Sequence, residues 1–179
     1  MQGKRIKIVD DEENVLKALE RTLIDENYTI VTARDGKEAL EKLELFPADI
    51  VMSDYTMPGM SGLEFLQQTK RLYPNTIRIL ITGSSDTQIT IEAINRGEIF
   101  RFLLKPWNDE ELKMTLHIAF EYHDLLSENK RLAATVKKQS SLLDELEKQN
   151  PGITKVDKEE DGSIVFDDED SDDIIQTLK

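Results

Sequence analysis

Acidic side chains stand at the ends of two apolar segments of strand character. Asp10 and Asp11 follow residues 5–9, and Asp54 follows residues 48–53 and leads into a Met-Pro-Gly turn. In an open α/β sheet, the loops at the carboxyl ends of the strands hold the ligands. Acids that converge there repel one another, and a divalent cation relieves the repulsion. Mg²⁺, which takes one or two carboxylates and keeps several waters, suits such a site better than a full protein cage would.

Asp54 is the candidate nucleophile of this acidic group. Two further apolar segments lead into Thr82 and Lys105, so four loops bring polar side chains to one edge of the predicted sheet. Once a cation and Lys105 reduce the negative field, an aspartate can attack phosphorus and form an acyl phosphate. The simpler interpretation of Asp54, taken alone, is an acid that caps a turn.

The elements that must position these residues alternate between strand and helix. Strands are expected at 5–9, 28–33, 48–53, 76–81 and 99–104. Helices are expected at 13–26, 35–46, 63–73 and 87–96 and from residue 108 onward. The apolar residues Val15, Leu19 and Leu23 are spaced as in a helix that buries one stripe. This alternation implies an α/β fold in which a parallel sheet is covered on both faces.

The last helix continues beyond the predicted domain and carries a heptad pattern. The seam extends from Ile118 to Asn150, and Gln139 weakens it. Within it, positions a are occupied by Asn129, Val136 and Leu143, and positions d by Leu125, Leu132 and Leu146. This mixture favours a parallel two-stranded coiled coil, and therefore a homodimer. Asn129 would fix the register, because two such side chains pair only when they are aligned. The alternative is a helix that folds back on its own domain.

The net charge of the chain is −13 over 179 residues, and about half of it lies near the C-terminus. Residues 151–179 hold ten Asp or Glu against three Lys, a net charge of −7. This acidity argues against nucleic acid as a direct partner, and we expect a disordered, solvated tail. The absence of Cys excludes disulfides and thiolate metal sites. With no signal peptide and no apolar stretch of about 20 residues, the chain is expected to be cytoplasmic and free of the membrane.

Taken together and in this order, the strand-end motifs resemble the receiver domain of two-component response regulators. The residues that carry the resemblance are Asp10-Asp11, Asp54 with Met57-Pro58-Gly59, Thr82-Gly83 and Phe102 to Pro106. The resemblance implies a doubly wound, flavodoxin-like sheet of five parallel strands in the order 2-1-3-4-5. The chain would then consist of a receiver domain at 1–122, a coiled-coil dimerisation helix at 123–150 and the acidic tail at 151–179.

The resemblance also assigns roles to the acids of the site. Asp10, Asp11 and Asp54 would bind Mg²⁺ together with the main-chain carbonyl of Thr56. Asp54 would be phosphorylated by a sensor histidine kinase, a phosphotransfer protein or a small phosphodonor. The chain would therefore be a signalling switch and not an enzyme.

The resemblance further predicts how the switch would work. Lys105 and Thr82 would contact the phosphoryl oxygens, and the peptide bond between Lys105 and Pro106 is expected to be cis. A phosphoryl group adds about −1.5 to −2 charges; it would draw Thr82 inward and leave space for the ring of Phe102. The surface of the fourth helix, the fifth strand and the last helix would change as a result, and an output partner would recognise it. Where the family often has Tyr, Phe102 offers no hydroxyl that could bond outward.

Two other functions are compatible with these residues. A Mg²⁺-dependent phosphatase would use Asp54 as nucleophile, but such enzymes usually carry a second Asp two residues later, where this chain has Thr56. An unphosphorylated scaffold would use the receiver fold and the coil for dimerisation alone. No output domain is recognisable, so output requires an unidentified partner or a further part of the protein. His117 and His123 are expected on the last helix, away from the acids, in surface or packing roles.

Overall fold

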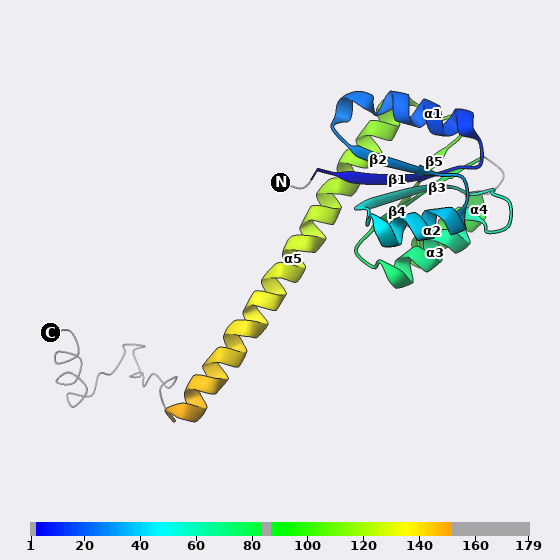
Figure 1. The fold of residues 1–179 in the computed structure, drawn as a ribbon. Helices are drawn as coiled ribbons and strands as arrows, with labels where there is room; N and C mark the ends of the chain where they lie inside the picture. Colours follow the sequence, from blue (N-terminus) through cyan, green and yellow to red (C-terminus); the bar gives the residue numbers. More distant parts are fainter. Residues whose placement is uncertain (1–2, 84–86, 152–179) are drawn as a thin grey trace. The chain divides into compact units, whose positions relative to one another are not determined.

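The computed structural model describes residues 3–83 and 87–151 (Figure 1). The strands are β1 (Arg5–Val9), β2 (Thr29–Ala33), β3 (Ile50–Asp54), β4 (Ile77–Thr82) and β5 (Arg101–Leu104). The helices are α1 (Glu13–Thr22), α2 (Gly36–Leu45), α3 (Gly62–Leu72), α4 (Thr87–Asn95) and α5 (Asp109–Gln149), with a 3-10 helix, η1, at Ile24–Glu26. Strands and helices therefore alternate as predicted.

All five strands form one parallel sheet in the order β2-β1-β3-β4-β5, which confirms the predicted fold class. Helices cover both faces of this sheet (Figure 1). On one face, Leu19 of α1 and Leu116 of α5 belong to the same buried cluster. On the other face, Leu43 of α2 and Phe65 of α3 do so. Because the sheet is covered on both sides, its strands read as nearly continuous apolar runs.

Side-chain caps fix the positions at which two helices begin. At the start of α2, Asp35 accepts a hydrogen bond from the backbone N–H of Glu38 at 2.8 Å. At the start of α3, Ser61 and Glu64 form a reciprocal capping box. Each cap satisfies a backbone donor that the first turn of a helix leaves without a partner. The connections after β2 and β3 thus have defined ends close to the carboxyl ends of these strands.

The prediction of one helix over 13–26 is wrong in its last part. α1 ends at Thr22, and η1 follows after Leu23, whose backbone leaves the helical conformation with φ −101° and ψ 3°. The side chain of Leu23 is nevertheless buried in the core. Asn27 then adopts the left-handed conformation with φ 53°, which Asn tolerates better than most residues. Burial of Leu23 and the turn at Asn27 together direct the chain into β2.

The long last helix is present as α5, and the compact units of the chain divide within it, between Asn129 and Lys130. Its large exposed apolar side chains are Met114, Tyr122, Leu125, Leu132, Val136, Leu142, Leu143 and Leu146. Five of these occupy the a and d positions assigned to the predicted coil, while Leu142 lies beside the seam. The coiled coil and the homodimer remain predictions.

The described residues end at Pro151, so the predicted acidic tail lies outside them apart from that residue. The division of the chain at 122 and 150 also remains a prediction. Within residues 3–83 and 87–151, no helix is long and apolar enough to cross a lipid bilayer.

Candidate functional site

Three of the predicted site residues meet at the carboxyl edge of the sheet, where the parallel strands end. The ammonium Nζ of Lys105 lies 2.9 Å from Oδ2 of Asp10 and 2.5 Å from Oδ1 of Asp54. Asp10 follows β1, Asp54 ends β3 and Lys105 follows β5. The backbone N–H of Lys105 also donates to the carbonyl of Thr82 at 2.8 Å, which joins the end of β4 to the same group.

Backbone donors orient both carboxylates. Oδ2 of Asp54 accepts a hydrogen bond from the N–H of Thr56 at 2.8 Å, and Oδ1 of Asp10 accepts one from the N–H of Glu12 at 2.9 Å. In each case the donor lies two residues after the acid, so the turn that follows the strand holds its own carboxylate. The Lys105 contacts use the remaining oxygen of each acid. Both carboxylates therefore have fixed directions before any ligand arrives.

Gly62 permits the close approach of α3 to this site. Its N–H donates to the carbonyl of Tyr55 at 2.9 Å, directly after Asp54. A Cβ atom at position 62 would lie 1.7 Å from the backbone oxygen of Asp54, a separation that no side chain can accept. The loop between β3 and α3 can therefore close only with glycine at this position.

The acids of the site are buried and only partly neutralised. Asp10 is fully buried and Asp54 is 6% exposed. Burial raises the pKa of Asp10, although its hydrogen bond to Lys105 acts in the opposite direction. Burial alone would lower the pKa of Lys105, but its hydrogen bonds to Asp54 and Asp10 raise it overall. Two carboxylates thus share one ammonium. When all three side chains are ionised, Asp10, Asp54 and Lys105 together keep one excess negative charge.

The predicted metal ligands do not all gather in this arrangement. Asp11 and Thr56 are exposed, and no three acidic or histidine side chains of the described residues are grouped so that they could hold a metal ion. Two of the three expected carboxylates, those of Asp10 and Asp54, therefore come together, and both contact the ammonium of Lys105.

The chemistry of the donor set nevertheless fits Mg²⁺. The available ligands are hard oxygens, and two of them belong to buried carboxylates with one balancing cation. A site with few carboxylates and access to water is the kind that Mg²⁺ accepts, since this ion retains several waters. The assignment of Asp10, Asp11, Asp54 and the Thr56 carbonyl as its ligands remains a prediction.

The two predicted switch residues lie on neighbouring strands. Thr82 is buried, and its hydroxyl donates to the carbonyl of Gly83 at 3.2 Å. In the sheet Thr82 pairs with Leu104, and Phe102 lies two residues before Leu104 on the same face. Phe102 is half-buried and packs against the cluster on the side of α2 and α3. This placement is compatible with the predicted exchange of position, which remains a prediction.

The residues that follow Lys105 anchor the start of α5. The Lys105-Pro106 peptide bond is cis, as predicted. Trp107 is half-buried and packs against the cluster that contains α1 and α5.

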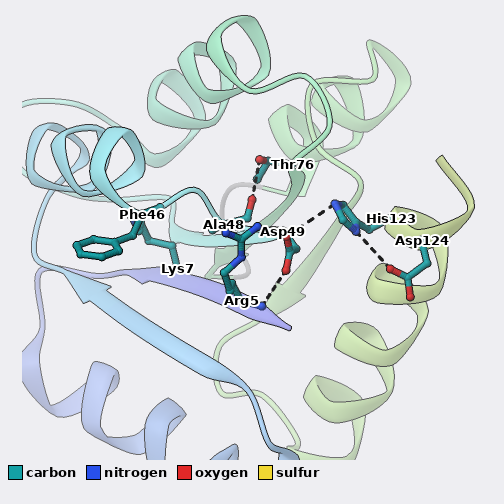
Figure 2. Close-up of polar contacts among 8 residues, drawn as sticks. All are labelled: Arg5, Lys7, Phe46, Ala48, Asp49, Thr76, His123 and Asp124. Atoms are coloured by element: carbon teal, nitrogen blue, oxygen red, sulfur yellow. Dashed lines mark hydrogen bonds and ion pairs between the residues drawn. The ribbon is translucent and has the colours of Figure 1, made fainter. Parts of the chain in front are cut away.

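Sequence reasoning missed a second polar group at the amino edge of the sheet, where the strands begin (Figure 2). Arg5 pairs with Asp49 through its guanidinium at 2.9 Å and through its backbone N–H at 2.9 Å. His123 of α5 lies 4.0 Å from the same carboxylate. Lys7, in the middle of β1, is buried. The signal for Lys7 was available, because a lysine inside an apolar strand of a covered sheet is unusual.

Comparisons with known proteins agree with the fold of the chain. A family model described as the response regulator receiver domain matches residues 6–117. The hydrogenase transcriptional regulatory protein HoxA of Cupriavidus necator is 32% identical over 144 residues, which cover 80% of this chain and 30% of that protein. The chain spans less than a third of the curated relatives it matches.

Solved structures give the same result. The signal receiver domain of an HD domain-containing protein from Pseudomonas fluorescens Pf-5 superimposes with a TM-score of 0.68 at 38% identity, over 72% of this chain and 94% of that one. The chemotaxis protein CheY4 of Vibrio cholerae gives a TM-score of 0.60 at 31% identity, over 65% of this chain and 98% of that one.

Proposed function

Because this chain belongs to the response regulator receiver family, we propose that it is a switch in which Asp54 accepts a phosphoryl group in the presence of Mg²⁺. The observation that carries the proposal is the sharing of one ammonium by two buried carboxylates at the carboxyl edge. Such a group is short of positive charge and is oriented in advance. Both properties suit the transfer of a phosphoryl group onto an aspartate.

The proposed step forms one bond and breaks one. A carboxylate oxygen of Asp54 bonds to phosphorus while the bond between phosphorus and the donor breaks, and the donor leaves with that electron pair. The N–H of Thr56 holds Oδ2 of Asp54 during this approach. Asp10, Asp11, Asp54 and the Thr56 carbonyl would hold Mg²⁺, which would neutralise part of the negative charge of the site when bound.

Lys105 and Thr82 are proposed to contact the transferred group. Lys105 already touches Asp54, so its ammonium lies close to any phosphoryl oxygen attached there. Movement of the Thr82 hydroxyl toward the phosphoryl group would leave space on the same face of the sheet for Phe102. The surface of α4, β5 and α5 would then differ between the two states.

The donor is proposed to be a sensor histidine kinase, a phosphotransfer protein or a small phosphodonor. The output is proposed to pass through the surface of α4, β5 and α5 to a partner, or to a further part of a longer protein. The HoxA relative is a transcriptional regulatory protein, and the match covers only 30% of it. We therefore include control of transcription only as a proposed output of this chain.

The second half of α5 is proposed to dimerise as a parallel coiled coil. Large apolar side chains stay exposed along the predicted seam, at Leu125, Leu132, Val136, Leu143 and Leu146. Burial of apolar surface contributes about 25 cal/mol per Å², so a second copy that covers this row would stabilise the helix. Asn129 would set the alignment of the two copies.

Phosphoryl uptake tests the central proposal. The native chain, incubated with acetyl phosphate and Mg²⁺, should gain the mass of one phosphoryl group, and Asp54→Asn should gain none. Asp49→Asn, which alters an acid at the amino edge, is the matched control and should behave as the native chain does. Equal uptake by Asp54→Asn would refute the assignment. Failure of the native chain with every donor would favour the scaffold, and turnover of a phosphomonoester would favour the phosphatase.

The oligomeric state tests the coiled coil separately. Leu132→Lys places a charge at a seam position and should convert the dimer to a monomer in sedimentation velocity. Ala134→Lys places the same charge on the outer side of the same turn and should leave the dimer intact. If both variants stay dimeric, or the native chain is a monomer at all concentrations, this part of the proposal is wrong.

A further inference from the structure

A cavity opens at the amino edge of the sheet, beside β1 and the connection from α2 to β3. It has a volume of about 240 Å³. Its apolar wall includes Val31, Pro47 and Ala48, and two cationic residues, Arg5 and Lys7, also belong to the lining. The cavity therefore combines an apolar body with positively charged side chains at one place. It lies at the opposite edge of the sheet from Asp54 and is distinct from the proposed phosphorylation site.

Lys7 is the unusual member of this lining. Its side chain is 1% exposed, and its Nζ donates to the backbone oxygen of Phe46 at 3.3 Å. Among the described residues, no carboxylate forms an ion pair with it. Burial, and to a smaller extent the nearby Lys42, lower the pKa of Lys7 to about 8. A buried ammonium without a counter-charge is costly, and an anion that entered the cavity would supply the missing charge.

Arg5 supplies a buried donor without an acceptor. Its guanidinium pairs with Asp49 through one terminal nitrogen, while its Nε is buried and has no hydrogen-bond partner among the residues that the structure describes. Arg5 and Lys7 lie two residues apart on β1 and so extend from the same face of the sheet; Figure 2 draws the two side chains next to each other. Asp49 balances one of the two cations. The edge is left with an excess of positive charge and with an unused N–H.

The rim of the cavity is apolar and exposed. Leu45 is 72% and Phe46 is 65% exposed, which is high for side chains of this size. Both belong to the lining, so they are placed to contact a ligand that enters. The volume lies below the roughly 300–1,000 Å³ of common ligand pockets, so the ligand must be small.

We propose that this cavity binds a small carboxylate with an apolar body, such as a monocyclic aromatic acid or a short fatty acid. The carboxylate would accept hydrogen bonds from Lys7 and Arg5, and the apolar body would lie against Val31, Ala48 and Phe46. Charge-assisted hydrogen bonds of this kind are about twice as strong as neutral ones. The proposal goes beyond the proposed phosphotransfer and does not depend on it.

Matched pairs of probes test the charge requirement on the native chain. Benzoate and hexanoate are titrated into isotopically labelled protein and followed by amide chemical shifts, with benzamide and hexanamide as neutral counterparts. Saturable shifts are expected at Lys7, Val31, Phe46 and Ala48, and the amides should bind at least about tenfold more weakly. Equal affinity for acid and amide would overturn the proposal, as would the lack of a saturable shift up to about 20 mM.

A pair of variants tests the assigned lysine. Lys7→Met replaces the side chain with an unbranched one of similar length and removes its charge, and it should weaken benzoate binding at least about tenfold. Lys42→Met removes a nearby charge that does not line the cavity, and it should retain the native affinity. Unchanged affinity in Lys7→Met would overturn the assignment. Phosphoryl uptake at Asp54 should be the same in both variants. A failure of carboxylate binding can therefore be distinguished from a failure of the proposed phosphotransfer.

Discussion

The two edges of the sheet bury charges of opposite sign. At the carboxyl edge, Asp10 and Asp54 share the single ammonium of Lys105. At the amino edge, Arg5 pairs with the carboxylate of Asp49, whereas Lys7 forms no ion pair with a carboxylate of the described residues. Each edge therefore keeps an excess of one sign, and the sign indicates which ion would complete it. A cation suits the first edge and an anion suits the second.

The two lysines of these edges differ although their side chains are chemically identical. Lys105 has two carboxylate partners, and its pKa is raised despite burial. Lys7 has a carbonyl partner, and its pKa falls to about 8. Burial acts in the same direction on both, so the neighbouring groups decide the outcome. The same substitution at the two positions should consequently have opposite effects on stability.

Lys105→Met should have the largest effect. It removes the cation that two buried carboxylates share, so the free energy of unfolding should fall by about 3 kcal/mol in urea titrations near neutral pH. Mg²⁺ should restore more stability to this variant than to the native chain, because it replaces the missing charge. If Lys105→Met is as stable as the native chain without Mg²⁺, the carboxyl edge does not carry the excess negative charge described above.

Lys7→Met should act in the opposite direction. The variant removes a buried ammonium that has no acidic partner within residues 3–83 and 87–151, and the Met side chain has a similar length and shape. We expect the free energy of unfolding to rise by about 2 kcal/mol at pH 7. A loss of stability in the same urea titration would mean that Lys7 contributes to the fold in its charged form, and the comparison of the two edges would fail.

The difference in the free energy of unfolding between the native chain and Lys7→Met should depend on pH, and this is the smallest and most specific of the expected effects. The pKa of Lys7 is about 8 in the folded chain and 10.5 is its ordinary value, so the unfolded chain binds more protons between these pH values. The native chain should therefore gain stability relative to Lys7→Met as the pH rises from about 8 to about 10.5. Urea titrations of both proteins at three pH values measure this change. A constant difference would show that Lys7 keeps its proton when folded.

The sequence predicts the positions of the site residues well, because topology alone determines them. Asp10, Asp54 and Lys105 each follow an apolar strand, and a parallel sheet brings such ends to one edge. Their pairing cannot be predicted in the same way. That Lys105 lies between the two acids depends on side-chain directions that no spacing in the sequence determines.

The side-chain contacts at the amino edge of the sheet are harder to predict from the sequence. The pair of Arg5 and Asp49 joins residues 44 positions apart, and it depends on the register between β1 and β3. The burial of the Lys7 side chain depends on how α2 and the following loop, which contains Phe46, cover β1. The end of α1 at Thr22 could not be predicted either. It depends on the burial of Leu23, which competes with continuation of the helix, and the helix propensities of the local residues do not reveal this competition.

A crystal structure of the chain with Mg²⁺ and beryllofluoride would decide whether Asp54 accepts a phosphoryl group. Beryllofluoride should be attached to Asp54 and in contact with Lys105 and Thr82, with Mg²⁺ bound by Asp10 and Asp11 beside it. A structure grown under saturating conditions in which Lys105 alone still bridges Asp10 and Asp54, with no ion beside them, would contradict this prediction.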